Sequence, residues 1–91
     1  MNYFNQPKLL DVQACEDYTL LLTYANGEKR IYDALPLLKF PAWKKLKNLD
    51  FFIRMAHVGD FNTVSWDDMT DIAPERLYEN SKPLESTTTR A

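Results

Sequence analysis

The dipeptide Asn26-Gly27 lies between two segments in which apolar and polar residues alternate. Residues 18–25 and residues 28–33 both show the two-residue period of a half-buried β-strand. A type I′ turn needs positive φ at both of its central positions, and asparagine and glycine adopt that conformation at little cost. The segment is therefore predicted to be an antiparallel β-hairpin, and this feature constrains the fold more than any other.

A third strand is predicted before the hairpin. In residues 8–15 the apolar side chains of Leu10, Val12 and Ala14 alternate with polar ones. Residues 16–17 are short and acidic, as expected of a turn between neighbouring strands. The three strands together predict an antiparallel β-meander.

Short helical segments are expected next. Asp33 can cap a turn at residues 34–38, because its carboxylate accepts hydrogen bonds from the free N–H groups at the start of a helix. Residues 41–49 are predicted to form a second short helix, with Trp43 on its inward face. A last helical turn is predicted to begin near Pro74, capped by Asp71 or Ala73.

Residues 51–58 form a short apolar run, which periodicity alone does not assign to helix or strand. We predict a strand, because the turn-forming residues 59–62 follow it and the strand-like residues 63–66 come next. The two strands would form a second hairpin. The expected fold is thus a single α+β domain, an antiparallel β-meander plus a second β-hairpin packed with two or three short helices.

The length of 91 residues allows one such domain, which we place at residues 1–81. Residues 82–91 are rich in Ser, Thr, Lys and Pro and are predicted to form a flexible tail. Cys15 is the only cysteine, so no internal disulfide can form. No apolar run approaches the roughly 20 residues that span a bilayer, and residues 1–7 do not resemble a signal peptide. These features predict a cytoplasmic protein without membrane contact.

A catalytic relay would have to use His57, the only histidine, with Cys15 or Ser65 as the nucleophile. Their spacing matches no nucleophile motif, and the chain has only two glycines to shape an oxyanion loop. A structural histidine on a strand is the favoured interpretation. We therefore expect no catalytic residues and no cofactor.

The densest carboxylate group consists of Asp60, Asp67, Asp68 and Asp71. Hard cations such as Mg²⁺ and Ca²⁺ bind several oxygen ligands, but this segment lacks the glycine and the distal glutamate of an EF-hand loop. Turn formation and helix capping explain the aspartates without a metal. No metal site is predicted.

Charge is unevenly distributed, although the net charge is only −2. Residues 29–54 contain seven basic and two acidic side chains, whereas residues 55–79 contain one basic and six acidic. One hypothesis is a basic face that meets phosphate or an acidic partner. Its residues would be Trp43, Lys44, Lys45, Lys47 and Arg54. The favoured alternative is a solvated helix face with Trp43 in the core, and opposed charges would also suit pairing with a partner or a second copy.

Aromatic residues are the other candidates for association. Tyr18, Tyr24 and Tyr32 lie within the meander. Two or three short helices are too few to cover both faces of the predicted sheet, so an uncovered aromatic face would mark an association surface. Homodimerisation or capture of a partner protein is therefore expected.

Several short segments in a fixed order resemble a known family. They are a Tyr-x-Leu-x-Leu strand, Asn-Gly-Glu, Pro36-Leu37-Leu38, Phe51-Phe52, Val64-Ser65-Trp66 and Asp71-Ile72-Ala73-Pro74-Glu75-x-Leu77-Tyr78. Over roughly residues 7–81 the chain resembles the small bacterial domains grouped as domain-of-unknown-function family 2442. The resemblance implies an α+β domain with an antiparallel sheet, sometimes fused to a DNA-binding domain, and gene neighbourhoods suggestive of toxin–antitoxin-like pairs. It brings no established activity.

These observations together predict a non-catalytic, cytoplasmic protein-interaction module. A regulatory role, or a place in a toxin–antitoxin-like pair, is the more specific expectation that the resemblance adds. The alternative is a nucleic-acid-associated regulator that uses the basic helix face.

Overall fold

The computed structural model describes residues 6–84 and contains two antiparallel sheets. The first has the strand order β1-β2-β3-β7, and the second has the order β4-β5-β6. The strands are β1 (Leu9–Ala14), β2 (Thr19–Tyr24), β3 (Lys29–Asp33), β4 (His57–Val58), β5 (Val64–Asp67), β6 (Thr70–Asp71) and β7 (Lys82–Pro83). The helical elements are the 3₁₀ segments η2 (Leu35–Lys39) and η3 (Pro41–Lys47) and the α-helices α1 (Leu49–Met55) and α2 (Pro74–Asn80). The predicted α+β fold is confirmed.

The hairpin at Asn26-Gly27 is confirmed, but its turn is of another type. Gly27 has φ +94°, whereas Asn26 is not among the described residues with positive φ. The Gly27 N–H donates to the Tyr24 carbonyl, and the Tyr24 N–H donates to the Glu28 carbonyl. This is a type I turn followed by a glycine bulge. The Asn26 side chain accepts a hydrogen bond from the Glu28 N–H at 3.0 Å, which stabilises the asparagine in its right-handed conformation.

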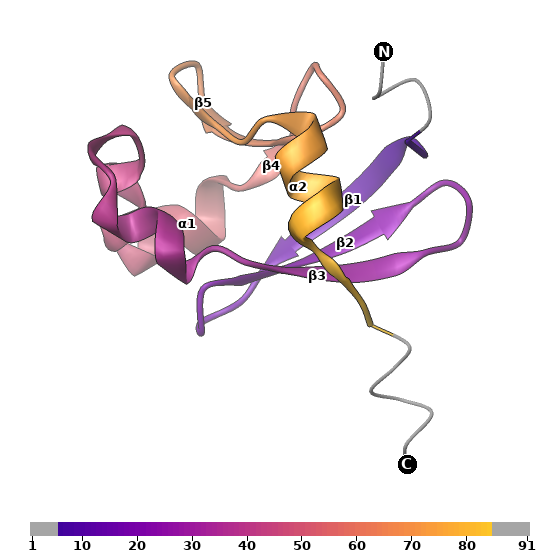
Figure 1. The fold of residues 1–91 in the computed structure, drawn as a ribbon. Helices are drawn as coiled ribbons and strands as arrows, with labels where there is room; N and C mark the ends of the chain where they lie inside the picture. Colours follow the sequence, from indigo (N-terminus) through magenta and orange to yellow (C-terminus); the bar gives the residue numbers. More distant parts are fainter. Residues whose placement is uncertain (1–5, 85–91) are drawn as a thin grey trace.

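One core lies between the inner face of the four-stranded sheet and the elements stacked on that face (Figure 1). The second sheet, α1 and α2 all contribute side chains to it. The fully buried side chains include Leu20, Leu22, Tyr24, Leu46, Phe52, Val64, Trp66, Ile72 and Leu77. Trp66 stacks on Phe52 with ring centroids 5.7 Å apart, and its Nε1 donates to the Phe52 carbonyl at 3.0 Å. The buried indole N–H is therefore satisfied.

The strand predicted over residues 51–58 is wrong for most of its length. Helix α1 occupies Leu49–Met55, and only His57–Val58 are extended. Asn48 accounts for the difference, because its side chain accepts a hydrogen bond from the Phe51 N–H at 3.2 Å and so caps the helix. The predicted helix at residues 41–49 is correspondingly shorter, since η3 ends at Lys47 and Asn48 is extended.

Capping of the other helical segments follows the prediction in part. The Asp33 carboxylate accepts a hydrogen bond from the Leu35 N–H at 3.0 Å, at the start of η2. Pro74 begins α2, where its missing N–H costs nothing, but the cap residue Ala73 provides no side-chain bond. Leu77 is buried and Tyr78 is half-buried, so α2 docks on the sheet through these two residues.

The flexible tail was predicted to start at residue 82, but Lys82 and Pro83 form strand β7. They pair with Ile31 and Arg30 of β3. An edge strand is held by backbone hydrogen bonds and need not bury its side chains, so a polar segment that contains proline can form one. Residues 85–91, the remainder of the predicted tail, lie outside the described residues.

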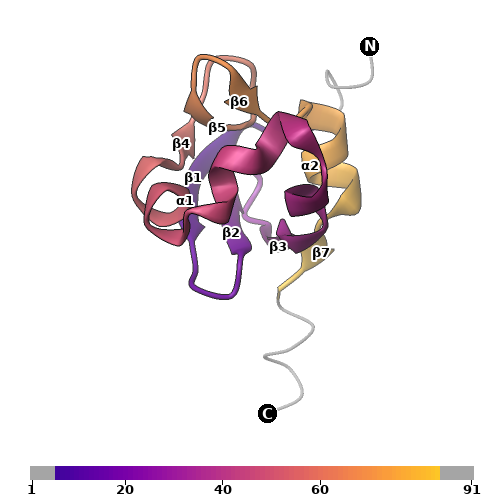
Figure 2. The ribbon, with the colours of Figure 1, turned by 90° about the vertical axis from the view of Figure 1, so that its left-hand side faces the viewer.

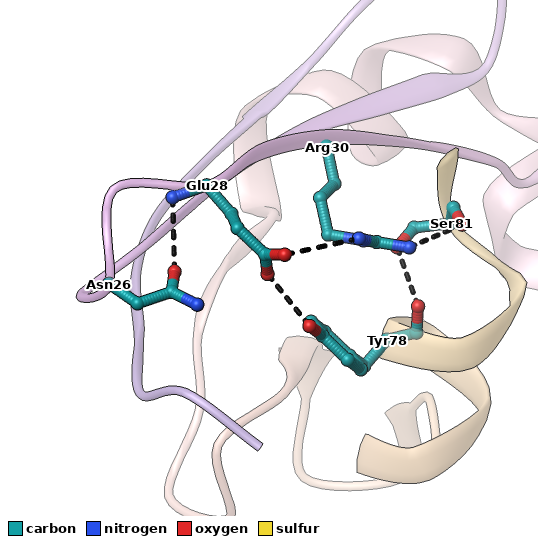
Figure 3. Close-up of polar contacts among 5 residues, drawn as sticks. All are labelled: Asn26, Glu28, Arg30, Tyr78 and Ser81. Atoms are coloured by element: carbon teal, nitrogen blue, oxygen red, sulfur yellow. Dashed lines mark hydrogen bonds and ion pairs between the residues drawn. The ribbon is translucent and has the colours of Figure 1, made fainter. Parts of the chain in front are cut away.

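A polar cluster fastens α2 and the segment after it to the hairpin (Figure 3). Arg30 donates from Nε to the Ser81 hydroxyl at 2.6 Å and from a terminal nitrogen to the Ser81 carbonyl at 2.9 Å. Its guanidinium also lies 4.5 Å from the centre of the Tyr78 ring. The Tyr78 hydroxyl donates to the Glu28 carboxylate at 2.7 Å, which raises the pKa of Tyr78. Because these side chains form hydrogen bonds with one another, the cluster serves to hold α2 against the hairpin.

The edge of β1 is joined to the second sheet by one side chain, Asn62, in the loop between β4 and β5. Its Oδ1 accepts from the Leu9 N–H at 2.7 Å, and its Nδ2 donates to the Pro7 carbonyl at 3.1 Å. Asn62 adopts φ +62°, a left-handed conformation that asparagine tolerates better than most residues. The amide therefore replaces a neighbouring strand at this edge.

The opposite face of the four-stranded sheet is covered by no element among residues 6–84, as Figures 1 and 2 show. Side chains at alternate positions of β2 point to this face and are half-buried, namely Thr19, Leu21 and Thr23. None of the helices within residues 6–84 is both long enough and apolar enough to cross a membrane.

Candidate interaction site

The outward face of the second sheet carries polar side chains from all three of its strands. His57 of β4 pairs with Ser65 of β5, and Ser65 pairs with Asp71 of β6. Residues at the alternating positions, such as Val64 and Trp66, are buried in the core. The two-residue period of the strands therefore brings His57, Ser65 and Asp71 together on one surface.

This surface is hollowed. The hollow has a volume of about 240 Å³. Its lining includes His57, Asp60, Phe61, Ser65, Asp67, Asp68 and Asp71, and we refer to it as the acidic hollow. At one end Gly59 packs closely on Ser65, and a Cβ at position 59 would lie 2.9 Å from the Ser65 Cβ. The lack of a side chain at this position therefore lets β4 approach β5.

Two large, exposed apolar side chains belong to the loops of the second sheet, and one of them, Phe61, lines the acidic hollow. Phe61 is 75% exposed and lies in the loop between β4 and β5. Met69 is 84% exposed and lies in the turn between β5 and β6, next to Asp68. Phe61 also lines a second hollow of about 520 Å³ beside Pro74 and Glu75. An exposed aromatic side chain that lines two hollows is typical of a surface that contacts another molecule.

Asp67 is the carboxylate of the acidic hollow that carries an ion pair. Lys45 of η3 lies 2.8 Å from its Oδ2, and the Met69 N–H donates to its Oδ1 at 3.0 Å. The hydrogen bond from Lys45, followed by that from Met69, lowers the pKa of Asp67 to about 2. Asp60, Asp68 and Asp71 add three further acidic side chains, so the acidic hollow favours a cationic ligand.

Within residues 6–84, Ser65 and His57 are not joined by a nucleophile–base hydrogen bond. The Ser65 hydroxyl donates to the backbone carbonyls of Asp67 and Thr70, at 3.3 and 3.5 Å, and not to the neighbouring histidine. His57 contacts the Met55 carbonyl through Nδ1 at 2.9 Å, and because a carbonyl only accepts, this nitrogen carries the proton. Within residues 6–84, no three His, Cys, Asp or Glu side chains are grouped closely enough to hold a metal ion.

Two of the three tyrosines proposed for an exposed aromatic face are buried. Tyr24 and Tyr32 are only 2% and 4% exposed and belong to the core. Burial raises the pKa of Tyr24 to about 12. Tyr18 is half-buried at φ +66°, where its hydroxyl donates to the Lys47 carbonyl at 3.0 Å and its ring packs on Phe52. Tyr24 of β2 and Tyr32 of β3 point inwards because large side chains are needed to fill the space between the sheet and the helices.

The residues of the predicted basic face are divided between several contacts. Trp43 is half-buried, and its Nε1 donates to the Asp71 carbonyl at 2.9 Å, so it links η3 to β6. Lys44, Lys45 and Lys47 are exposed, but Lys45 is paired with Asp67. Arg54 lies 3.5 Å from Asp50, one turn earlier on α1. Trp43 and Lys45 thus border the acidic hollow.

The sequence interpretation missed Phe61 and Met69. Both are apolar residues within turn segments, at positions that no strand or helix period directs towards the core. That feature is the signal that could have identified them, because an apolar side chain in a turn often remains exposed.

A family model described as "Protein of unknown function (DUF2442)" matches residues 9–83. The match confirms the family resemblance inferred from the order of the short segments. No curated protein and no solved structure matches the chain.

Proposed function

The chain belongs to the DUF2442 family of proteins of unknown function, and we propose that it is a non-catalytic protein-interaction module of the cytoplasm. Its binding site is the acidic hollow, and its ligand is a partner protein with a basic segment. The proposal rests on the exposure of Phe61, which lines this hollow, and of Met69, which follows the lining residue Asp68 in the chain. Aromatic and methionine side chains are enriched in protein interfaces, where they often dominate the binding energy.

The acidic side chains support a basic partner. Asp60, Asp68 and Asp71 line the hollow together with Phe61. Carboxylates around an apolar contact steer oppositely charged partners towards it and exclude acidic ones. A basic segment of the partner, with an apolar residue placed on Phe61 or Met69, fits this arrangement best.

The contacts of the basic residues favour a protein partner over nucleic acid. Among residues 6–84, Lys45 is paired with Asp67 and Arg54 with Asp50, so two of the four exposed cations of the predicted basic face already lie against a carboxylate. The acidic hollow adjoins Lys45, and its carboxylates would repel phosphate. A regulatory role, including one in a toxin–antitoxin-like pair, stays a prediction because it depends on who the partner is.

The contacts of Ser65 and His57 support a binding role over catalysis. A serine nucleophile needs a base within hydrogen-bond reach, but the Ser65 hydroxyl is directed to backbone carbonyls. His57 is exposed on the short strand β4. Both side chains can donate or accept hydrogen bonds at the floor of a binding surface.

The test is photo-crosslinking followed by affinity measurements. A benzophenone side chain at position 61 should capture a partner protein in cells, and one at position 35 should not capture it. Leu35 is a matched control, because it is a large apolar side chain that is 53% exposed and lies in η2, outside the lining of the acidic hollow.

The captured partner is then purified and its affinity measured. Phe61→Ala and Met69→Ala should each weaken binding by roughly tenfold, as expected for anchor residues, whereas Leu35→Ala should leave it unchanged. Equal affinity of all three variants would contradict the proposal. Salt-sensitive binding of DNA or RNA that Lys44→Glu and Lys47→Glu abolish would instead establish the nucleic-acid alternative.

A further inference from the structure

The uncovered face of the four-stranded sheet has an apolar centre. Leu21 of β2 and Ile31 of β3 are paired in the register, so both point to this face, and both are half-buried. Thr19 and Thr23 flank Leu21 on the same strand. We refer to the surface formed by alternate residues of β1, β2 and β3 as the outer face.

The outward side chains of β3 carry charges in a pattern that complements itself. Along β3 the outward positions are Lys29, Ile31 and Asp33, so an apolar residue stands between a cation and an anion. At about 3.3 Å per residue, the two charged positions are about 13 Å apart. A half-turn about an axis that passes just outside Ile31, parallel to the sheet and perpendicular to the strand, brings a second outer face against the first and exchanges the two ends of β3.

We propose that the outer face is a dimer interface and that its occupant is a second copy of this chain. In that arrangement Leu21 and Ile31 of the two copies pack together, and Lys29 of each copy lies against Asp33 of the other. The symmetry makes the contact isologous, so one complementary pair of charges is used twice. The self-complementary charge pattern is what favours a second copy over another protein.

The end of the outer face at Asp33 has room for Lys29 of the second copy. A hollow of about 370 Å³ lies there, with Asp17, Thr19, Ile31, Asp33 and Lys82 in its lining. The Asp17 carboxylate is fixed by the Thr19 hydroxyl at 2.6 Å and by the Thr19 N–H at 3.2 Å. Two carboxylates and one cation leave a net negative charge in the hollow, which the second copy's Lys29 would neutralise.

The size of the outer face sets the expected strength. Four strands at about 4.8 Å and six residues at about 3.3 Å give a footprint of about 400 Å². A standard interface buries about 800 Å² on each partner. The dimer should therefore be weak, with a dissociation constant on the order of 10–100 µM. The dimer uses a different surface from the acidic hollow, so a result that contradicts one proposal leaves the other unaffected.

The test is analytical ultracentrifugation of the full chain from about 1 µM to about 1 mM, the range that brackets this affinity. The wild type should form dimers as concentration rises. Lys29→Asp places aspartate against aspartate, and Asp33→Lys places lysine against lysine, so each variant alone should dimerise at least roughly tenfold more weakly. An equimolar mixture of the two variants should form heterodimers, because the mixed interface contains two Asp–Lys pairs, one in the wild-type orientation and one reversed.

Lys44→Asp is the matched control, since it makes the same change of net charge on η3, away from the outer face. It should dimerise like the wild type. Asp33→Lys also removes the hydrogen bond to the Leu35 N–H, so circular dichroism must show that this variant is folded. A wild type that remains monomeric throughout, a Lys29→Asp variant with unchanged dimerisation, or a mixture that does not associate would each overturn the proposal.

Discussion

Removal of the Asn62 amide tests whether one side chain joins the two sheets. The amide makes two hydrogen bonds, to the Leu9 N–H and the Pro7 carbonyl, and Leu9 is only 2% exposed. Asn62→Gly deletes both bonds and leaves a buried donor unpaired, which should cost about 2–3 kcal/mol of unfolding free energy. Asn62→Ala should cost about 1 kcal/mol more, because the native φ of +62° disfavours alanine.

Asn62→Asp separates the two bonds, because a carboxylate still accepts from Leu9 but cannot donate to Pro7. It should lose about 1 kcal/mol. Urea unfolding followed by tryptophan fluorescence reports these differences, since Trp66 stacks on Phe52 in the core. The reasoning would be refuted if all three variants unfolded within about 0.5 kcal/mol of the wild type. Equal losses for glycine and alanine would refute the backbone part of the argument.

Three further predictions concern stability. Lys45→Met should raise the pKa of Asp67 from about 2 towards its ordinary value. The depressed pKa stabilises the fold above about pH 4, and this contribution is lost as pH falls towards 2. The variant should therefore lose less unfolding free energy between pH 4 and pH 2 than the wild type. Urea unfolding at each pH measures the free energy, and NMR of the carboxylate measures the pKa. Because the pKa of Tyr24 is raised to about 12, its contribution is complete below pH 10 and is lost as pH approaches 12. Alkaline unfolding should therefore be weaker in Tyr24→Phe, by at most about 2–3 kcal/mol. Gly59→Ala should destabilise the chain by about 1–3 kcal/mol in thermal unfolding, because the added Cβ meets the Ser65 Cβ at 2.9 Å; an unchanged midpoint would show that β4 can move away.

Local sequence rules predict the meander well, because its strands keep one buried side and its turn contains Asn26-Gly27. They fail at residues 51–55, where a helix and a strand bury similar apolar residues and the Asn48 cap decides between them. They also fail at β7, because the pairing of Lys82 and Pro83 with β3 depends on where the chain lies after α2. Both errors arise where tertiary context outweighs local pattern.

The candidate site was less predictable than the fold. The excess of acidic residues after residue 55 was visible in the sequence, but its concentration around His57 and Ser65 depends on strand pairing. The alternation of the meander residues was clear, but the sequence does not say which side is buried, and the structure places Tyr24 and Tyr32 in the core. Lys45 was predicted to face solvent, and it does, yet its ion pair with Asp67 joins segments 22 residues apart.

The central claim is that the acidic hollow binds a partner protein. It is tested most directly by NMR, in which the ¹⁵N-labelled chain is titrated with the purified protein captured at position 61. The largest amide shifts should fall within residues 57–71, around Phe61 and Met69. Shifts confined to residues 44–47, or no shifts at saturating partner, would contradict it.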